Sequence, residues 1–280
     1  MGDVLWIEPI LRVLASKYDR VIIYTKHPNL FENFPFSNVT FKSQLSFFEK
    51  VLIRLEKLAG INWLSVDLDN AYERKPELHF LNAYQHRANL PLTREYPKLY
   101  LSPEETITKP FAEPYIVLHI ETLSDKKFRH VYGIKWEQVT SFLQEKGFRV
   151  VQVGIGKEHV NGTIPMKTSV RELISVIYHA AYFIGIDSGP SHIAASLGIP
   201  SLLIFGAIDP SLRHFPELFN GILLKQACKN DCTTFDATTD IAHHCSALLT
   251  NGIPRCCVFN TGFVILEIDN LIKKNAHKIH

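Results

Sequence analysis

A short polar turn follows an apolar run, residues 183–186, in the second half of the chain. The turn consists of Asp187-Ser188-Gly189-Pro190-Ser191-His192. Glycine lets the backbone approach a ligand closely, and proline suits the first turn of a helix because its missing N–H would have no partner there. The free N–H groups and the positive end of the helix dipole favour an anion, above all a phosphate. The turn is therefore predicted to hold a phosphorylated ligand beside the Asp187 carboxylate and the His192 imidazole.

A second group with chemical potential is a set of cysteines and histidines near the end of the chain. In order, its members are Cys228, Cys232, His243, His244, Cys245, Cys256 and Cys257. Thiolates and imidazoles are the ligands of tetrahedral metal sites, but the Cys-x2-Cys pairs typical of such sites are missing from this sequence. A metal held by Cys228, Cys232, Cys245 and Cys256 is one interpretation. Buried or loosely paired thiols are the other.

Composition and charge exclude several classes of protein. At 280 residues, 46% of them apolar, the chain can bury the cores of two domains. No apolar run approaches the roughly 18 residues that span a bilayer, and residues 1–9 carry Asp3 and Glu8 without the basic cluster of a secretory signal. The net charge of +2 is too small to indicate nucleic-acid binding, and it allows at most peripheral membrane contact.

The odd number of cysteines and the missing export signal favour a reducing compartment. We therefore expect a cytoplasmic protein, with peripheral placement at the inner membrane face as a further option.

Short apolar segments alternate with segments of helical periodicity, which predicts parallel sheets connected by helices. Strands are predicted over residues 20–25, 39–43, 63–68, 115–120, 149–153, 183–186 and 201–205. Helices are predicted over residues 3–18, 45–58, 76–90, 136–146, 169–180 and 191–197. Residues 91–114 are rich in proline and typical of a linker.

This pattern predicts an α/β protein with two Rossmann-like domains, over residues 1–106 and 107–280. The second would contain the cysteine segment 228–257 and a terminal helix. A strand normally leads into a turn such as Gly2-Asp3, so the first domain is expected to lack its usual first strand.

Two motifs in the chain resemble those of a known family. The longer motif is Asp187-Ser188-Gly189-Pro190-Ser191-His192-Ile193-Ala194-Ala195-Ser196-Leu197-Gly198-Ile199-Pro200, followed by Leu203-Ile204-Phe205-Gly206 and Asp209-Pro210. The shorter is Gly2-Asp3-Val4-Leu5, leading to Pro9. Their order and separation are similar to those of glycosyltransferase family 9, the ADP-heptose:lipopolysaccharide heptosyltransferases. The similarity extends thinly from Gly2 to about Leu271.

The resemblance implies a GT-B fold, in which two Rossmann-like domains face each other across a cleft. It also implies metal-independent, inverting transfer of a sugar, expected to be heptose from ADP-heptose. The acceptor would be a glycan, a lipid-linked molecule of the lipopolysaccharide type or a protein. Such a transfer needs a base for the acceptor hydroxyl and groups that stabilise the departing diphosphate. A catalytically impaired nucleotide-sugar-binding protein and a GT-B sugar-nucleotide epimerase are the alternatives.

The family's functional residues can be carried over one by one. Asp3 matches the general base, with an N-cap on the first helix as the structural alternative. Asp187 matches the acidic residue near the donor sugar. Ser188 and Gly189, followed by Pro190, match the backbone donors to the diphosphate. His192 matches the histidine one helical turn further on.

Other donor-binding residues come from the loops that follow the strands. Lys135, next to Trp136, lies one residue from the position of the family's cation that binds the diphosphate, and Ile134 occupies that position. Glu158 matches a carboxylate for the ribose hydroxyls, with a solvated glutamate at a helix start as the alternative. Two further matches are His119 and Thr122, in a loop that contacts the donor.

Three basic residues in the preceding loop, Lys126, Lys127 and Arg129, can substitute for Lys135. Gly154 belongs to the same donor-binding set. It opens a Gly-x-Gly turn that is only half of a dinucleotide fingerprint, so NAD is not predicted. Some relatives that glycosylate bacterial autotransporters hold iron with cysteines in this region. The cysteine spacing here is not close enough to theirs to carry the iron over. Iron or zinc at the cysteine cluster stays one of the two interpretations, and no cofactor is expected to be required for catalysis.

Overall fold

The computed structural model describes residues 1–60, 65–122, 124, 126–154, 156, 159–228 and 245–276. Its largest element is a parallel sheet of six strands in the order β5-β4-β3-β6-β7-β8. The strands are β3 (Tyr115–His119), β4 (Arg149–Val153), β5 (Ile164–Met166), β6 (Tyr182–Ile186), β7 (Ser201–Phe205) and β8 (Gly221–Lys225). Counted along the chain, this order is 3-2-1-4-5-6, the order of a Rossmann dinucleotide-binding sheet. The sheet confirms the α/β prediction.

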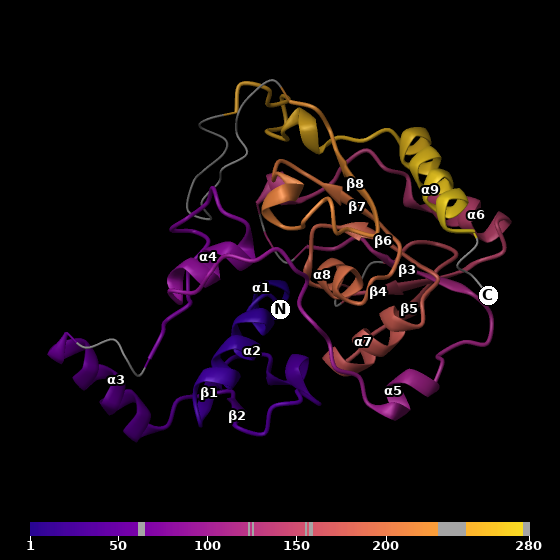
Figure 1. The fold of residues 1–280 in the computed structure, drawn as a ribbon. Coiled ribbons are helices and arrows are strands. Elements are labelled where there is room, and N and C mark those ends of the chain that lie inside the picture. Colours follow the sequence, from indigo (N-terminus) through magenta and orange to yellow (C-terminus); the bar gives the residue numbers. More distant parts are fainter. Residues whose placement is uncertain are drawn as a thin grey trace.

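Helices cover both faces of this sheet (Figure 1). The helices α6 (Trp136–Glu145) and α9 (Thr261–Asn275) lie on one face, and α7 (Val170–Tyr178) and α8 (Gly189–Ser196) on the other. Successive side chains of a strand point to opposite faces. Tyr182 and Ile184 accordingly belong to the core between the sheet and the helices α6 and α9, whereas Phe183 belongs to the core on the side of α7 and α8. Burial on both faces explains why the central strands are continuous apolar runs.

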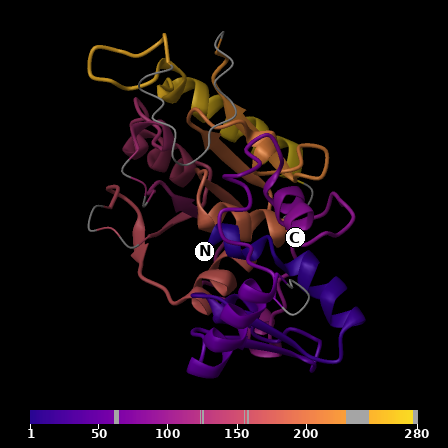
Figure 2. The same ribbon diagram turned by 90° about the vertical axis from the view of Figure 1, so that its left-hand side faces the viewer.

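The N-terminal part contains a smaller parallel sheet, β1 (Val21–Tyr24) and β2 (Val39–Lys42). Around it lie α1 (Gly2–Leu5), α2 (Glu8–Lys17), η1 (Pro28–Phe31), α3 (Phe47–Ala59), α4 (Phe80–Arg87) and α5 (Pro103–Ile107). In Figure 2 the N-terminal helices, in indigo, and α9, in yellow, lie on opposite sides of the large sheet. The described residues also form the single turns η2 (Lys127–Arg129), η3 (Pro210–Leu212) and η5 (Arg255–Cys257).

Several elements differ from the sequence prediction. The helix predicted over residues 3–18 is two helices, because Pro9 has no N–H to donate to the carbonyl of Leu5 and would clash with it. Residues 65–68 form no strand, so the prediction over residues 63–68 is wrong for the part described. The helix predicted over residues 76–90 shortens to α4, with the His79 imidazole accepting the N–H of Leu81 at its start.

The segment predicted as a linker is partly ordered by local capping. Ser102 and Glu105 form a capping box at the start of α5. Earlier in the same segment, the N–H of Lys98 and the hydroxyl of Tyr100 donate to the buried Glu8 carboxylate, both at 2.9 Å. The segment therefore packs against α2 as well as joining the two sheets. The domain boundary at residue 106 stays a prediction.

Candidate functional site

The topology of the large sheet predicts the place of a ligand crevice. Its strand order reverses between β3 and β6, and open α/β sheets bind ligands at the carboxyl ends of the strands at such a point. His119 ends β3 and Asp187 directly follows β6. The predicted phosphate-binding turn thus lies at the switch point of the sheet.

The Asp187 carboxylate is the buried acid of this turn. Its Oδ2 lies 3.0 Å from Nη2 of Arg129, and its Oδ1 lies 3.8 Å from Nε2 of His192. Neither oxygen has a well-formed hydrogen bond to another described residue. The Ser188 hydroxyl and the Nε of Arg129 are likewise buried without a hydrogen-bond partner among the described residues. Because buried polar groups normally have partners, this set marks a place for a polar ligand.

His192 connects the turn to the N-terminal part of the chain. The indole N–H of Trp6 donates to Nδ1 of His192 at 3.1 Å. Since indole nitrogen can only donate, Nδ1 carries no proton and the neutral ring holds its proton on Nε2, the side facing Asp187. Burial first, and then the neighbouring His214 and Arg213, hold the pKa of His192 well below its ordinary value. The imidazole is therefore neutral at pH 7.

An aromatic cluster surrounds this contact, and we call it the aromatic junction: Trp6, His79, His192, His214 and Phe215. His192 and His214 stack with their ring centroids 4.8 Å apart. His79 stacks on Phe215 at 3.8 Å. The junction therefore joins rings from α1 and the start of α4 to rings from α8 and the segment after β7.

The two sequence motifs touch each other here. A Cβ atom added to Gly2 would lie 2.6 Å from Cδ2 of His192, and one added to Gly189 would lie 2.9 Å from Cε of Met1. Only glycine lets the backbones of α1 and α8 approach this closely. The structure thus brings the predicted catalytic turn against the predicted donor-binding turn, although the two are far apart in sequence.

Asp3 belongs to α1 itself, and Met1 is the N-cap of that helix. The N-cap alternative for Asp3 is therefore wrong. Its Oδ2 accepts the hydroxyl of Tyr72 at 3.3 Å. Burial, followed by the charge of Asp3, raises the pKa of that Tyr72 hydroxyl, so it stays protonated and donates.

Sequence reasoning missed Arg213. Its guanidinium is buried, with Cζ 3.9 Å from the ring centroid of Phe80 and 5.6 Å from that of Tyr72. Burial lowers the pKa of Arg213, and the carboxylates of Asp187 and Asp3 offset only part of this shift. Its Nε has no hydrogen-bond partner among the described residues. The only sequence signal was its position shortly after the Asp209-Pro210 end of the longer motif.

The structure also places the candidate cations. Lys135 is exposed at the N-cap of α6, and its backbone N–H donates to Thr261 at 2.9 Å. Lys127 donates to the carbonyl of Asn251 at 2.6 Å. Arg129, named as a substitute, is the one that pairs with Asp187. The described contacts therefore favour Arg129 and Arg213 over Lys135 as cations near the turn, whereas the role of Lys135 stays a prediction.

The loops after β3 and β4 meet through a carboxylate that the sequence did not single out. The N–H of Gly156 donates to Oε2 of Glu121 at 2.8 Å, and a Cβ on Gly154 would lie 2.6 Å from Oε1 of Glu121. Glu158 lies outside the described residues. Glu121 is thus the described acid that lies against the Gly154 turn.

The remaining two loop residues have local partners. Nδ1 of His119 donates to the carbonyl of Val153 at 2.8 Å, and burial lowers the pKa of the ring, so it is neutral. The hydroxyl of Thr122 accepts the N–H of Ser124 at 3.2 Å. His119 therefore bonds across two neighbouring strands at the crevice.

The cysteine cluster is only partly described. Cys228 is exposed, Cys245 half-buried, and Cys256 and Cys257 buried. Cys232, His243 and His244 lie outside the described residues. Within the described ranges no three His, Cys, Asp or Glu side chains are placed to hold a metal ion. Hydrogen bonding from Cys257 lowers the pKa of the Cys256 thiol below its ordinary value.

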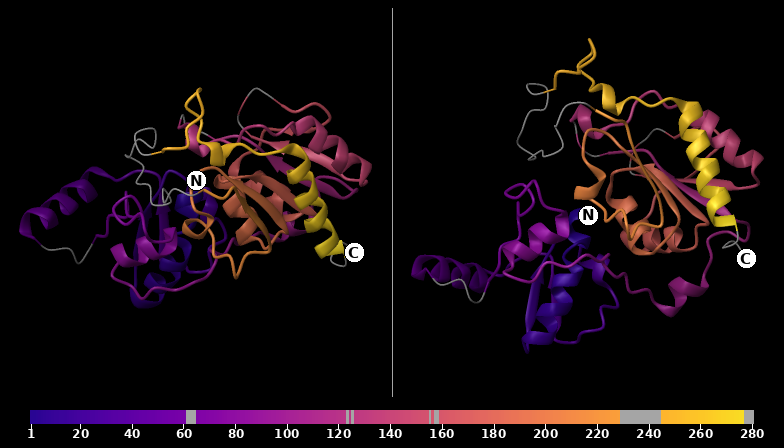
Figure 3. Two further views of the ribbon diagram at one scale, coloured as in Figure 1. Left: turned by 90° about the horizontal axis from the view of Figure 1, so that it is seen from above. Right: turned by 45° about the horizontal axis from the view of Figure 1, so that its top comes forward.

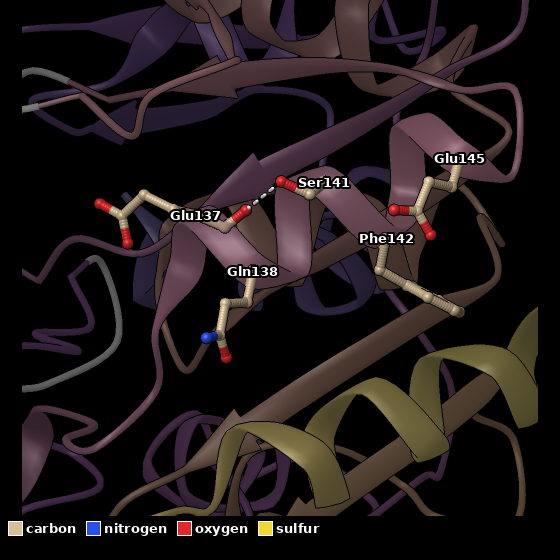
Figure 4. Close-up of a pocket in the computed structure, with 5 residues that line it drawn as sticks. All are labelled: Glu137, Gln138, Ser141, Phe142 and Glu145. Atoms are coloured by element: carbon tan, nitrogen blue, oxygen red, sulfur yellow. Dashed lines mark hydrogen bonds between the residues drawn. The ribbon is translucent and has the colours of Figure 1, made fainter.

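A separate surface hollow of about 360 Å³ lies along α6 (Figure 4). It is lined by Glu137, Gln138, Ser141, Phe142 and Glu145. All five come from one helix, and none is a candidate site residue. The hollow is therefore no part of the crevice at β3 and β6.

Fold and site together define an α/β protein of the GT-B type. A model of glycosyltransferase family 9 (heptosyltransferase) matches residues 69–232, and the chain belongs to this family. The autotransporter heptosyltransferase Aah of Escherichia coli is 27% identical over 192 residues, which cover 59% of this chain and 46% of Aah. Lipopolysaccharide heptosyltransferase 3 of Escherichia coli K12 is 34% identical over 91 residues, 27% of this chain and 26% of that protein.

Solved structures share the fold at lower identity. The iron-containing dodecameric heptosyltransferase TibC of enterotoxigenic Escherichia coli, in complex with ADP-D-β-D-heptose, matches with a TM-score of 0.68 at 18% identity, over 99% of this chain and 76% of TibC. Escherichia coli ADP-heptose heptosyltransferase II matches with 0.62 at 15%, over 98% of this chain and 96% of that one. These likenesses confirm the GT-B prediction. The chain spans about half the length of the autotransporter heptosyltransferases that it matches.

Proposed function

We infer that this protein is an inverting glycosyltransferase that transfers heptose from ADP-heptose. The observation that carries the proposal is the contact between the Gly2–Asp3 turn and the Ser188–His192 turn. One turn offers a carboxylate that can serve as a base, and the other offers a helix N-terminus that can bind a diphosphate. The family supports sugar transfer from a nucleotide-sugar donor.

On the donor side, the N-terminus of α8 and the hydroxyl of Ser188 would bind the diphosphate. The positive charges of Arg129 and Arg213 would stabilise the diphosphate, and this stabilisation would increase as negative charge builds up on the departing diphosphate. Both guanidiniums have an Nε without a hydrogen-bond partner among the described residues. This charge would replace the catalytic metal that other transferases use. Glu121 or Glu158 would bind the ribose hydroxyls.

On the acceptor side, Asp3 would take the proton of the acceptor hydroxyl. The oxygen then forms a bond to the anomeric carbon on the face opposite the diphosphate. The bond from that carbon to the diphosphate breaks, its electron pair leaves with ADP, and the configuration inverts. The Tyr72 hydroxyl holds the Asp3 carboxylate in place, as the 3.3 Å hydrogen bond supports.

The acceptor, the location and the metal belong to the same proposal. The acceptor is a glycan, a lipid-linked molecule or a protein, and the location is cytoplasmic. Iron or zinc at the cysteine cluster would be structural. Elemental analysis of the purified protein should then find a near-stoichiometric metal that Cys228→Ser removes, and a metal-free protein of unchanged stability would contradict this part.

A thermal-shift and transfer experiment tests the proposal. ADP and ADP-heptose should raise the melting temperature by mass action, and ADP-heptose should be consumed when an acceptor is supplied. Gly189→Val should abolish the shift, because its side chain enters the turn next to Met1. Gly262→Val, in the first turn of α9, is the matched control and should keep the shift.

Each outcome of this experiment has a meaning. No stabilisation by any nucleoside diphosphate or sugar nucleotide at millimolar concentration would contradict the donor site. Binding without transfer to any acceptor would indicate the impaired binding protein. Conversion of the donor into an isomeric sugar nucleotide would indicate the epimerase.

A further inference from the structure

Helix α3 presents a large apolar face to solvent. Six of its apolar side chains are between 39% and 79% exposed. They are Phe47, Phe48, Val51, Leu52, Leu55 and Leu58. A helix on a globular protein normally turns its apolar stripe inward and its charges outward. In α3 the apolar stripe is exposed to solvent, which calls for a function.

The spacing of these residues puts them on one side of the helix. Positions three and four apart, such as Leu55 and Leu58, lie above one another on a helix. They form a continuous stripe, which we call the α3 face. A contiguous exposed apolar surface of this kind marks a protein or membrane contact.

The acidic side chains of α3 are turned toward its own chain. Glu49 accepts Nζ of Lys42 and the N–H of Ser46, both at 2.7 Å. Glu56 accepts the hydroxyl of Ser65 at 2.8 Å. These bonds fix the rotation of the helix about its axis, so the α3 face points outward.

The charges left at the exposed surface of the helix are positive. Lys50 and Arg54 are exposed, and on a helical projection both lie at one edge of the α3 face. A stripe of Phe and Leu bordered by Lys and Arg is the composition of helices that lie in the plane of a membrane surface.

The position of α3 suits a flat partner. The helix extends away from the body of the molecule in both views of Figure 3 and forms its outermost edge in Figure 1. None of the helices in the described part of the chain has the length and apolar character needed to cross a membrane. A membrane contact through α3 would therefore be peripheral.

We propose that α3 binds the surface of an anionic lipid bilayer, with the α3 face at the boundary between headgroups and acyl chains. Lys50 and Arg54 would contact the anionic headgroups. Docking against a second copy of this chain fits less well. It would gather the cations of two α3 helices in one interface, while Glu49 and Glu56 stay bound within their own chains.

Vesicle co-sedimentation of the full chain tests this proposal. Vesicles of phosphatidylglycerol with phosphatidylethanolamine should bind the protein, and vesicles of phosphatidylcholine should bind it far more weakly. Phe48→Ser with Leu55→Ser should weaken binding by at least about tenfold, because two large side chains no longer enter the bilayer. Lys50→Glu with Arg54→Glu should weaken binding by at least about fivefold for each cation lost.

Ile107→Ser is the matched control, because Ile107 is 77% exposed on α5, outside the α3 face. It should leave vesicle binding unchanged. All of the substituted positions are exposed, and circular dichroism would check that each variant folds. The proposal does not depend on the transferase, since the nucleotide thermal shift should survive every α3 variant.

Two results would overturn the lipid proposal. One is binding that is equally strong to neutral and anionic vesicles, or that no α3 variant weakens. The other is a concentration-dependent dimer in sedimentation velocity that Phe48→Ser with Leu55→Ser dissociates, together with no vesicle binding. That result would assign the α3 face to a second copy of the chain.

Discussion

The two sheets of this protein are buried to different degrees. Every residue of β3, β6 and β7 is buried, whereas every residue of β1 is only partly buried. The central strands of the large sheet have a strand on each side and helices on both faces. In contrast, β1 pairs with β2 alone within the described ranges. The large sheet is therefore covered largely by its own strands and helices, whereas the small sheet of β1 and β2 is not.

The cores show what the N-terminal part depends on. One core lies within the C-terminal part, mainly between the large sheet and the helices α6 and α9. The other includes Leu5, Trp6 and Phe80 together with Val117 and Phe183 of the large sheet. The N-terminal part thus shares this core with the large sheet and with the helices α7 and α8. A change at their contact should alter function or stability more than a change at the edge of either part.

The largest expected effect is on chemistry, at the point where both parts contribute. Asp3→Asn should cut transfer at least a hundredfold, because a general base contributes about 10²–10⁴-fold. Binding of the nucleotide-sugar should stay near that of the unchanged protein, as thermal shift can measure. Asp19→Asn, an exposed aspartate after α2, is the control. Transfer that survives Asp3→Asn would remove Asp3 from the mechanism.

Core truncations compare the two sheets directly. Ile184→Ala, in β6, removes a side chain that is fully buried between the sheet and α9. It should lower the free energy of unfolding by about 2–5 kcal/mol. Ile23→Ala, in the partly buried β1, should cost about 1 kcal/mol, since less apolar surface is lost. Equal costs in urea denaturation would show that the two sheets are equally well packed.

Acid should weaken the aromatic junction. Burial lowers the pKa of His214 to about 4 from an ordinary value of 6.5. Above pH 6.5 the ring is neutral whether the chain is folded or unfolded. Between pH 6.5 and about 4 only the unfolded chain binds the proton, so the free energy of unfolding falls as the pH falls.

For His214 this loss is about 2 kcal/mol between pH 6.5 and 5. His214→Phe keeps an aromatic ring in the stack and should reduce the slope of this part of the pH profile, measured by denaturation at each pH. Part of the slope should remain, because burial also lowers the pKa of His192 and of His79. The exposed His86→Gln is the control. An unchanged slope in His214→Phe would show that the junction does not sense acid through this ring.

The smallest effect concerns the connection between the two parts. Arg171, on α7, donates from Nε to Oε1 of Glu105 at 2.7 Å and from Nη2 to the carbonyl of Tyr100 at 2.9 Å. Arg171→Met should lower the free energy of unfolding by about 1–2 kcal/mol, because these charged bonds are only partly shielded from water.

Arg149→Met serves as its control, since the pair of Arg149 with Glu113 is well exposed. That variant should change the free energy of unfolding by at most about 0.5 kcal/mol. If both variants cost the same, the connecting segment would add nothing to the link between the parts.

The sequence was most informative where burial is complete. The strands β4 and β7 have the predicted bounds, residues 149–153 and 201–205. Both are short and mostly apolar, as strands covered on both faces are expected to be. The edge strands β5 and β8 were missed. Pro165 interrupts the pattern in β5, and β8 starts at Gly221, where a Cβ would lie 1.9 Å from the carbonyl oxygen of Ser201.

The candidate site also has one part that could be predicted from the sequence and one part that could not. The turn from Asp187 to His192 is a local signal, carried by consecutive residues, and it could be predicted. The contacts of that turn with Trp6, Arg129 and Arg213 could not. Trp6 and His192 are 186 positions apart, and no periodicity or spacing connects two residues at that separation.

The hydrogen bond between Trp6 and His192 also makes the contact between the two turns observable by light. Trp6 is fully buried, and its indole N–H is held by an imidazole. In a protein with Trp63→Phe and Trp136→Phe, the remaining indole would emit at short wavelength while the turns touch. Its emission would move to longer wavelength when they separate and water reaches the ring. Donor and acceptor could then be added in turn, and the emission wavelength of Trp6 would show whether each one separates the two turns or brings them together.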